Sequence, residues 1–543
     1  MTGHRCVLPD EHLFLRLPNG SLKAVEAKPN TIIEINRLGN IPTSYILGRP
    51  YHHTFELLEK KEGEQHSRLR LVTPVELEAE RAAGDAGLEE SRNAPTDSPA
   101  DANGEEIDLV TEEGKVVVKN NRLIIDDGNR QTLTHEEIEA LKKSSGGREV
   151  VEKILANHTA LDEKTAFSRA KYTLRKTRKY LKRFTLLPME LGLLIEYVLE
   201  KEPPRIMELR EESLALVTSW SNAHWNSPDD LYDIGGGELR GDGRLLVVDD
   251  AGGLIVAGLA ERKGILRATH NTPAMSDAQP MEVDGEKSTD TTVHKDFPLP
   301  AKTNSLTLLH SAIQPNVSLL KYFGYDTNHP DQNHPLHTHL RSLSWLQLLH
   351  PEEDPLYQEP ETMTEEVVQS WKPGKRGTYY KKRRRWERCK AISDEARAGG
   401  FDGLIIATHM DLTGLLSRTL PLLRGGAQVV IYSPNVEPLA KVVDLYSKDR
   451  RAAYNALRAQ DPDSDPPVED FPLDPRLLLA PTLQTSRVRE YQVLPGRTHP
   501  LMTSRGGSEG YVLTARRVLP LAGNVEARGH FGRKRKAGAA VSA

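Results

Sequence analysis

Three short apolar runs place the strongest constraint on how this chain of 543 residues can fold. They are Leu245–Asp250 (LLVVDD), Phe401–Thr408 (FDGLIIAT) and Gln428–Tyr432 (QVVIY). Continuous apolar runs of this length are typical of parallel strands that are buried on both faces. Residues 412–423 (LTGLLSRTLPLL) read as a helix that we expect to end at Gly425-Gly426. Strand–helix–strand units of this kind predict an α/β fold with a doubly wound, Rossmann-like sheet over residues 203–520.

The first 133 residues have a different pattern, with short segments that alternate apolar and polar positions. HLFLRL, LKAVEAK, TIIEINRLG and TSYILGR are separated by the turn sequences PNG, KPN and GNIP. Several short strands at close intervals predict a small β-barrel-like or sandwich domain. Residues 79–106 are acidic and rich in Ala, Gly, Ser and Pro, which predicts a disordered insert. Further inserts are expected at about 226–242, 268–302 and 456–470, and a disordered basic tail at 521–543.

Residues 134–202 read as a helical connector that contains a strongly basic segment. Thr134 and Glu137 have the spacing of a capping box that opens the first helix. Residues 164–184 then predict a basic helix, because Phe167, Leu174, Leu181 and other apolar residues recur at helical spacing up to residue 184. Its cations are Lys164, Arg169, Lys171, Arg175, Lys176, Arg178, Lys179, Lys182 and Arg183. A solvated charged helix would interleave acidic residues for pairing, and none interrupts these cations, so we interpret the helix as a face that binds a polyanion such as RNA.

Composition limits the remaining classes of protein. The net charge is −5, so only local clustering of cations can indicate nucleic acid. The only two cysteines, Cys6 and Cys389, lie far apart, which excludes a disulfide framework or a thiolate zinc site. No signal-peptide core and no apolar run of membrane length is found, so we expect a soluble intracellular protein.

The most plausible cofactor position is Val247–Leu254 (VVDDAGGL), at the end of the first buried strand. A site for S-adenosylmethionine here needs several glycines, so that backbone N–H groups can approach the ligand. The chain offers only Gly252 and Gly253 after Asp249 and Asp250, and Leu254 follows at once. We therefore interpret it as a degenerate loop that binds no cofactor. No catalytic residue and no metal site is predicted elsewhere.

Three further segments contain clusters of histidines or cations. His329, His334, His337 and His339 lie in a stretch rich in Pro and Asn, which favours an insert over a metal site. Gly374–Lys390 is a second basic block with Tyr379, Tyr380 and Trp386 among its cations, and it fits either a second RNA contact or the polar face of a helix. Gly532–Lys536 (GRKRK) is similar to a nuclear import signal.

The chain resembles the non-catalytic, RNA-binding subunit of eukaryotic tRNA (adenine-58-N1)-methyltransferase, in a fungal version with inserts. The resemblance rests on stretches in a fixed order across nearly the whole chain. They include Gly48–Tyr51, Asn120–Asp126, Lys164–Tyr172, Leu246–Arg262, Phe401–Ala407, Val430–Pro434 and Tyr491–Pro500.

This resemblance implies a nuclear heterotetramer, with two copies each of this chain and of a paralogous catalytic subunit that binds S-adenosylmethionine. In that partner, the equivalent of Val247–Leu254 is an intact glycine-rich loop. The equivalent of Thr408–Asp411 carries a catalytic aspartate followed by a proline-containing motif, and this chain lacks the proline. The alternatives are an active methyltransferase that uses Asp249 or Asp250 with Asp411, and a general RNA-binding factor.

Overall fold

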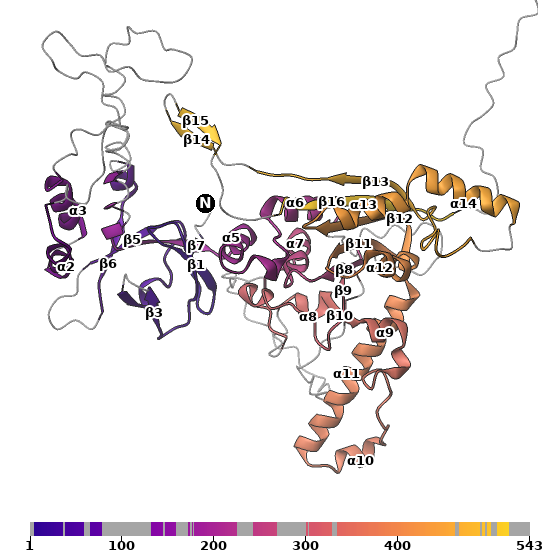
Figure 1. Cartoon of the computed structure of the whole chain (residues 1–543). Helices are drawn as coiled ribbons and strands as arrows, with labels where there is room; N and C mark the ends of the chain where they lie inside the picture. Colours follow the sequence, from indigo (N-terminus) through magenta and orange to yellow (C-terminus); the bar gives the residue numbers. More distant parts are fainter. Residues whose placement is uncertain are drawn as a thin grey trace, which may run out of the picture.

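The computed structural model describes a β domain, a short helical connector and a larger α/β domain (Figure 1). The described residues are 5–35, 39–58, 66–78, 132–144, 147–158, 172–173, 176–177, 179–224, 243–268, 300–301, 303–327, 334–461, 466–488, 491–494, 497–500 and 508–520. The insert expected at 79–106 and most of the inserts expected at 226–242 and 268–302 lie outside them. No helix in the described part of the chain is both long and apolar enough to cross a membrane.

The larger domain is built on a sheet of seven strands in the order β10-β9-β8-β11-β12-β16-β13. The first five strands of this order are parallel, and β16 pairs antiparallel with both β12 and β13. The strands are β8 (Leu245–Asp249), β9 (Leu306–His310), β10 (Leu340–Ser344), β11 (Phe401–Ala407), β12 (Leu423–Ser433), β13 (Leu478–Gln484) and β16 (Tyr511–Arg517). In chain order the parallel strands follow the Rossmann-like sequence 3-2-1-4-5, so the predicted doubly wound sheet is confirmed.

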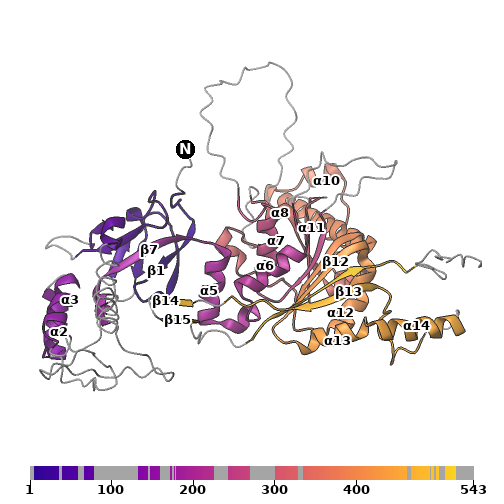
Figure 2. The ribbon, with the colours of Figure 1, turned by 90° about the horizontal axis from the view of Figure 1, so that it is seen from above.

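Helices cover both faces of this sheet, and successive residues of each strand enter two different cores. Leu245 and Val247 pack in one core with α5, α6 and α7, whereas Leu246 and Val248 pack in the other with α9, α11, α12 and α13. Figure 2 shows the two layers from above. The helices are α5 (Leu191–Lys201), α6 (Glu211–Trp220), α7 (Leu254–Arg262), α8 (Leu336–His339), α9 (Trp345–Leu349), α10 (Glu365–Gln369), α11 (Pro373–Ala398), α12 (Leu412–Thr419), α13 (Glu437–Leu445) and α14 (Lys448–Gln460).

The N-terminal domain contains a five-stranded antiparallel sheet in the order β2-β1-β7-β5-β6 and a separate β3-β4 hairpin. Its strands are β1 (His12–Arg16), β2 (Leu22–Glu26), β3 (Ile32–Ile35), β4 (Gly39–Pro42), β5 (Thr54–Leu57), β6 (Leu69–Val72) and β7 (Arg183–Pro188). The pairings among the described residues do not close this sheet into a barrel, so the barrel-like arrangement is not confirmed. The strand expected at 43–49 is wrong, because Thr43–Tyr45 forms a 3-10 turn (η2).

Strand β7 corrects the predicted extent of the basic helix. The helical residues of this segment end at Tyr180, and Arg183–Pro188 is a strand between β1 and β5. The side chain of Phe184 stacks on Phe55 at 5.9 Å between ring centroids, so it belongs to the β domain and not to a helical seam. The predicted connector therefore contributes a central strand to the N-terminal sheet.

The helices of the connector are α2 (His135–Ser144) and α3 (Gly147–Ala156). The predicted capping box is confirmed, since Glu137 N–H donates to Thr134 Oγ1 (3.2 Å) and Thr134 N–H donates to Glu137 Oε2 (2.9 Å). Another expectation is wrong, because Gly425-Gly426 lies inside β12 and does not terminate the helix before it. The remaining elements are η5 (Pro203–Ile206), η7 (Leu320–Phe323), η8 (Pro351–Glu353), η9 (Leu420–Leu422), β14 (Tyr491–Leu494) and β15 (Arg497–Pro500).

The two domains share one core. Phe14 and Leu187 of the N-terminal sheet belong to the same cluster of buried side chains as Leu194 and Val198 of α5. The ring of Phe14 lies 5.4 Å from that of Tyr197. Helix α5 follows β7 almost directly, so it fixes the β domain against the Rossmann-like sheet.

Candidate functional site

The loop after β8 lies where doubly wound sheets bind nucleotides, at the carboxyl ends of the strands beside the switch in strand order. Gly252 and Gly253 have φ values of +70° and +93°, which side chains with a Cβ rarely adopt. Asp250 N–H donates to Ala407 O (2.8 Å), which ties the loop to the end of β11. The backbone thus forms a tight turn into α7 at the expected place.

The space above these two glycines is filled by the chain itself, by the segment Val317–Leu320. A Cβ at Gly252 would lie 3.2 Å from Leu319 Cδ1, and a Cβ at Gly253 would lie 3.1 Å from Val317 Cα. Leu319 N–H donates to Gly252 O (3.1 Å), and the side chain of Leu319 is almost fully buried. The glycines therefore allow a leucine-bearing segment to pack closely against this turn.

The two carboxylates of the loop have structural partners. Asp249 is buried and accepts hydrogen bonds from Ala251 N–H (2.7 Å) and Val256 N–H (3.0 Å). Desolvation raises the pKa of Asp249 to about 6, although these backbone donors act in the opposite direction. Asp250 accepts hydrogen bonds from the Thr408 hydroxyl and from His409 N–H. Both side chains thus hold the turn and the β8–β11 edge together.

The neighbouring strand β9 ends in His310, a residue that sequence reasoning missed. Nucleotide-binding sheets commonly place a carboxylate near this edge to hold the ribose hydroxyls. The His310 ring is instead within 2.7 Å of Ala312 O and 2.8 Å of Ser342 Oγ. Burial lowers the pKa of His310 from its ordinary value, which favours a neutral ring. The apolar run LTLLH indicates a buried strand that ends in His310, but β9 was not among the strands predicted from the sequence.

Asp411, the candidate base of the alternative reading, is the N-cap of α12. Its carboxylate accepts a hydrogen bond from Gly414 N–H (2.8 Å) and lies 3.7 Å from Lys441 Nζ. The hydrogen bond from Gly414 and the charge of Lys441 lower the pKa of Asp411. A carboxylate with a lowered pKa is a weak base at neutral pH, so this geometry favours a capping role.

The described histidines of residues 329–339 pack as structural side chains, and His337 and His339 lie in α8 and not in an inserted loop. His334 is buried with its Nε2 3.1 Å from Phe323 O, and the His337 ring lies 4.7 Å from the ring of Tyr325. His329 lies outside the described residues. Among the residues that the structure describes, no three His, Cys, Asp or Glu side chains are grouped closely enough to hold a metal ion.

The structure describes part of the basic helix, and there it packs on the residue His158, just after the end of α3. The ring of Tyr172 meets His158 edge-on at 4.9 Å, and Lys176 Nζ lies 4.9 Å from the centre of the same ring. Lys179 is exposed, and its Nζ lies 5.5 Å from the ring of Tyr180. These residues form a docked helical segment that presents cations beside aromatic rings.

The remaining predicted RNA-binding residues fall into two groups. Lys182 is half-buried between the helix and β7, and its carbonyl accepts a hydrogen bond from Leu57 N–H (2.8 Å). Arg183 lies in β7, where it is buried, with its Nη2 3.6 Å from Glu56 Oε2. The ion pair with Glu56 assigns Arg183 to the β domain. Lys164, Arg169, Lys171, Arg175 and Arg178 lie outside the described residues.

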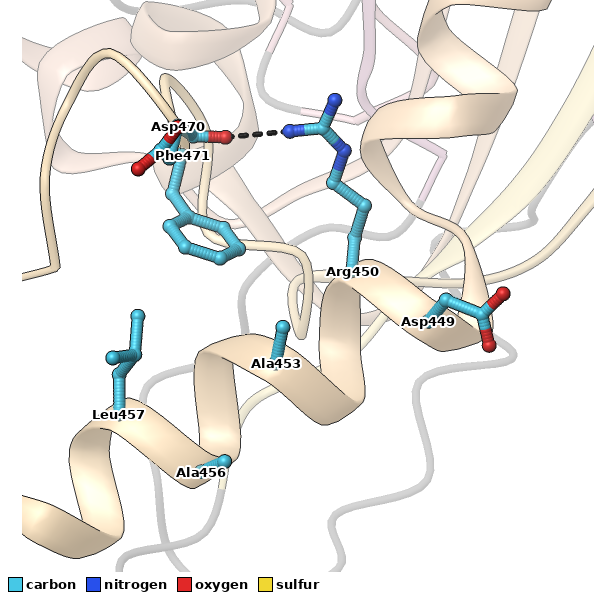
Figure 3. Close-up of a pocket in the computed structure, with 7 residues that line it drawn as sticks. All are labelled: Asp449, Arg450, Ala453, Ala456, Leu457, Asp470 and Phe471. Atoms are coloured by element: carbon cyan, nitrogen blue, oxygen red, sulfur yellow. Dashed lines mark hydrogen bonds between the residues drawn. The ribbon is translucent and has the colours of Figure 1, made fainter.

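A separate open pocket of about 560 Å³ lies between α14 and the segment around Phe471 (Figure 3). Its floor is apolar, with Ala453, Leu457 and Phe471. The guanidinium of Arg450 at its rim donates to Asp470 O (2.6 Å). The pocket lies away from the carboxyl edge of the parallel strands and contains no pair of groups suited to acid–base chemistry.

Comparison with known proteins identifies the family. The model of the Gcd10p family matches residues 6–372. A curated relative from Aspergillus fumigatus is 44% identical over 98% of this chain and 96% of its own length. The chain belongs to the Gcd10p family. That relative is named tRNA (adenine(58)-N(1))-methyltransferase non-catalytic subunit trm6.

Less similar relatives from other fungi carry the same name. The relative from Debaryomyces hansenii is 28% identical over 98% of this chain and 90% of its own length. The relative from Schizosaccharomyces pombe is 24% identical over 96% of this chain and 94% of its own length. These names confirm the resemblance inferred from the sequence and the prediction of a non-catalytic subunit.

Solved structures give weaker likenesses. An S-adenosylmethionine-dependent O-methyltransferase from Thermotoga maritima aligns over 95% of this chain and 97% of its own, with a TM-score of 0.40 and 7% identity. The tRNA (m1A58) methyltransferase TrmI from Aquifex aeolicus covers 95% of this chain and 100% of its own, with a TM-score of 0.37 and 8% identity. The assignment of the fold rests on the order and register of the strands.

Proposed function

We propose that this chain is the non-catalytic, tRNA-binding subunit of a tRNA (adenine-58-N1)-methyltransferase complex. The observation that carries the proposal is the loop after β8, where Leu319 packs on Gly252 at the edge of the sheet at which doubly wound folds bind nucleotides. A chain whose own leucine occupies that position is suited to binding and positioning the RNA. The name of the Aspergillus fumigatus relative supports this reading.

In this proposal the basic helix binds phosphates of the tRNA. In its described part Tyr172 packs on His158, just after the end of α3, so Lys176 and Lys179 are held on a firm support. The lysines supply the charge for phosphate contacts, and the tyrosine rings beside them are suited to stacking on exposed bases. Such contacts fix the register of an RNA without reading its sequence.

The chemistry of the reaction explains why a binding subunit is useful. N1 of adenine lies on the Watson–Crick edge, so an adenine inside a folded tRNA must be exposed before it can be methylated. Extruding a base costs about a few kcal/mol. Phosphate contacts made by a second subunit offset that cost and hold the RNA in register.

The proposal includes the catalytic partner, the stoichiometry of the complex and its location in the cell. S-adenosylmethionine binds to a paralogous catalytic subunit, and the complex is a heterotetramer with two copies of each chain. The basic sequence Gly532–Lys536 directs the assembly to the nucleus. This chain binds no cofactor or metal of its own.

The test reverses three charges of the basic helix, with the substitutions Arg175→Glu, Lys176→Glu and Lys179→Glu. We expect weaker tRNA binding and a salt dependence whose log–log slope falls by about 2 to 3, since each lost phosphate contact removes roughly 0.7 to 0.9. Co-purification with the catalytic paralogue should be unchanged.

A control variant carries the same change of charge on exposed cations of three separate helices, with Arg397→Glu, Arg418→Glu and Lys448→Glu. We call it the scattered control. If both variants bind tRNA as the native chain does, the basic helix is not the RNA-binding element. If no catalytic paralogue co-purifies, the proposal of a methyltransferase subunit is wrong.

A further inference from the structure

Helix α11 extends away from the body of the Rossmann-like domain. Its buried side chains, Ile392, Ser393 and Ala396, all lie in its C-terminal third. From Pro373 to Ala391 every side chain of this fully described helix is exposed or half-exposed. Figure 1 shows this part of α11 projecting beyond the sheet toward α10. Most of a helix of 26 residues is therefore held out in solvent.

We call Pro373–Ala391 the arm, and an acidic segment, residues 351–366, covers one side of it. The segment contains seven Asp or Glu residues and no Lys or Arg. Trp386 Nε1 donates to Tyr357 O (3.0 Å), and Tyr379 Oη accepts a hydrogen bond from Met363 N–H (3.2 Å). Two of the three aromatic residues noted in this basic block thus hold the acidic segment in place.

The opposite side of this part of α11 is positively charged. Lys381, Arg384 and Arg385 have the i, i+3, i+4 spacing of one helix face, turned away from Tyr379 and Trp386. Lys381 and Arg385 are exposed, and Arg384 is half-exposed. Residues 372–386 contain eight cations and no acidic residue. We call Lys381, Arg384 and Arg385 the outer face of α11.

The outer face is fixed to the domain by the next turn of the same helix. Arg388 donates hydrogen bonds to His337 O (3.0 Å) and Leu340 O (3.3 Å) at the edge of the sheet. Burial lowers the pKa of Arg388, and its two hydrogen bonds to backbone carbonyls make it a structural residue. The charges of the outer face therefore sit on a rigid support.

We infer that the outer face of α11 is a second RNA-binding surface, which takes the phosphate backbone of a folded RNA. The inference rests on the proposed function and adds a contact in the Rossmann-like domain, far along the chain from the basic helix. A solvated helix would alternate the signs of its charges, and here the signs are separated onto two sides of one arm. Guanidinium groups suit phosphate because their forked donors match its oxygens. The acidic segment repels phosphate from the other side, so an RNA can approach from one direction only.

The test uses the full chain and a tRNA transcript, and compares four proteins by equilibrium binding at several salt concentrations. They are the native chain, an outer-face variant with Lys381→Glu, Arg384→Glu and Arg385→Glu, the basic-helix variant and the scattered control. We expect the outer-face variant to lose at least about tenfold in affinity and the log–log salt slope to fall by about 2 to 3. The scattered control should change much less, and circular dichroism should show native folding in all four.

The outcomes separate this inference from the proposed function. If the outer-face variant binds tRNA like the native chain while the basic-helix variant does not, the second surface is refuted and the proposed function stands. If the native chain binds no tRNA, both are refuted. If the outer-face variant keeps its RNA affinity but loses the catalytic partner, the face binds protein and the inference is wrong.

Discussion

Replacing Leu319 by alanine tests whether the segment Val317–Leu320 packs over the glycine loop as described. Leu319 is almost fully buried, and its Cδ1 would be the nearest atom to a Cβ at Gly252. Substitution of a buried leucine by alanine removes apolar contacts and leaves a cavity, at a cost of about 2–5 kcal/mol. The hydrogen bond from Leu319 N–H to Gly252 O is made by the backbone and is kept in the variant.

The loss is measured by thermal unfolding of the full chain. In a domain of this size about 1 kcal/mol shifts the unfolding temperature by about 2–4 °C, so we expect the transition of the Rossmann-like domain to fall by at least about 4 °C. Leu346→Ala is the matched control, because Leu346 is a leucine of the same domain with 42% of its surface exposed. Surface substitutions of this kind change stability by about 0.5 kcal/mol or less. Equal effects of the two substitutions would refute the packing of Leu319 against the loop.

Three further predictions concern the loop and the β domain. Gly253→Ala should cost about 1–3 kcal/mol because Gly253 has a positive φ, whereas Gly374→Ala, with open space at its Cβ, should be neutral or slightly stabilising in the same melting assay. Burial raises the pKa of Asp249 to about 6, so the folded state binds the proton more tightly than the unfolded state does. Asp249 should therefore contribute stability below about pH 4 that is lost as the pH rises through 6. A melting temperature that does not fall over this range, relative to that of Asp249→Asn, would contradict the shift. Glu56→Gln removes the carboxylate that Arg70 Nη2 (2.5 Å) and the buried Arg183 Nη2 (3.6 Å) share, and should cost about 1–3 kcal/mol in denaturant unfolding. A loss no larger than that of Glu78→Gln, an exposed glutamate, would show that these ion pairs do not stabilise the sheet.

Three of the five parallel strands, β8, β11 and β12, could be predicted because a strand buried on both faces must be apolar throughout, whereas β9 and β10 were not predicted. Leu245–Asp249 and Phe401–Ala407 meet that requirement, and the polar residues after them mark the edge where the loop lies. The capping box at Thr134 could be predicted for a similar reason, since the two residues that satisfy each other are three positions apart. Both predictions use only residues that lie close to one another in the sequence.

Strand β7 could not be predicted in this way. Leu181 and Phe184 continue the helical spacing of the basic segment, so the pattern gives no sign of a strand. The strand forms because β1 and β5, which lie more than 100 residues earlier in the chain, offer their edges to Arg183–Pro188. Burial between two strands outweighs local helix propensity, and the partners of a strand cannot be read from its own sequence.

The packing of residues 317–320 against the glycine loop was also beyond the sequence. The degenerate glycine loop indicated a lost site, but Val317 and Leu319 look like ordinary core residues in the sequence. Only the fold shows that they lie on Gly252 and Gly253. The sequence predicted that the loop was incomplete, and the structure shows which residues occupy the space.

Calorimetric titration of the purified full chain with S-adenosylmethionine tests the central claim most directly. Because Leu319 covers the loop and Asp249 is turned inward to Ala251 and Val256, we predict no saturable binding at concentrations that saturate ordinary methyltransferases. The catalytic paralogue, titrated in the same buffer, serves as the positive control. Saturable binding to this chain alone with a micromolar Kd would contradict the account.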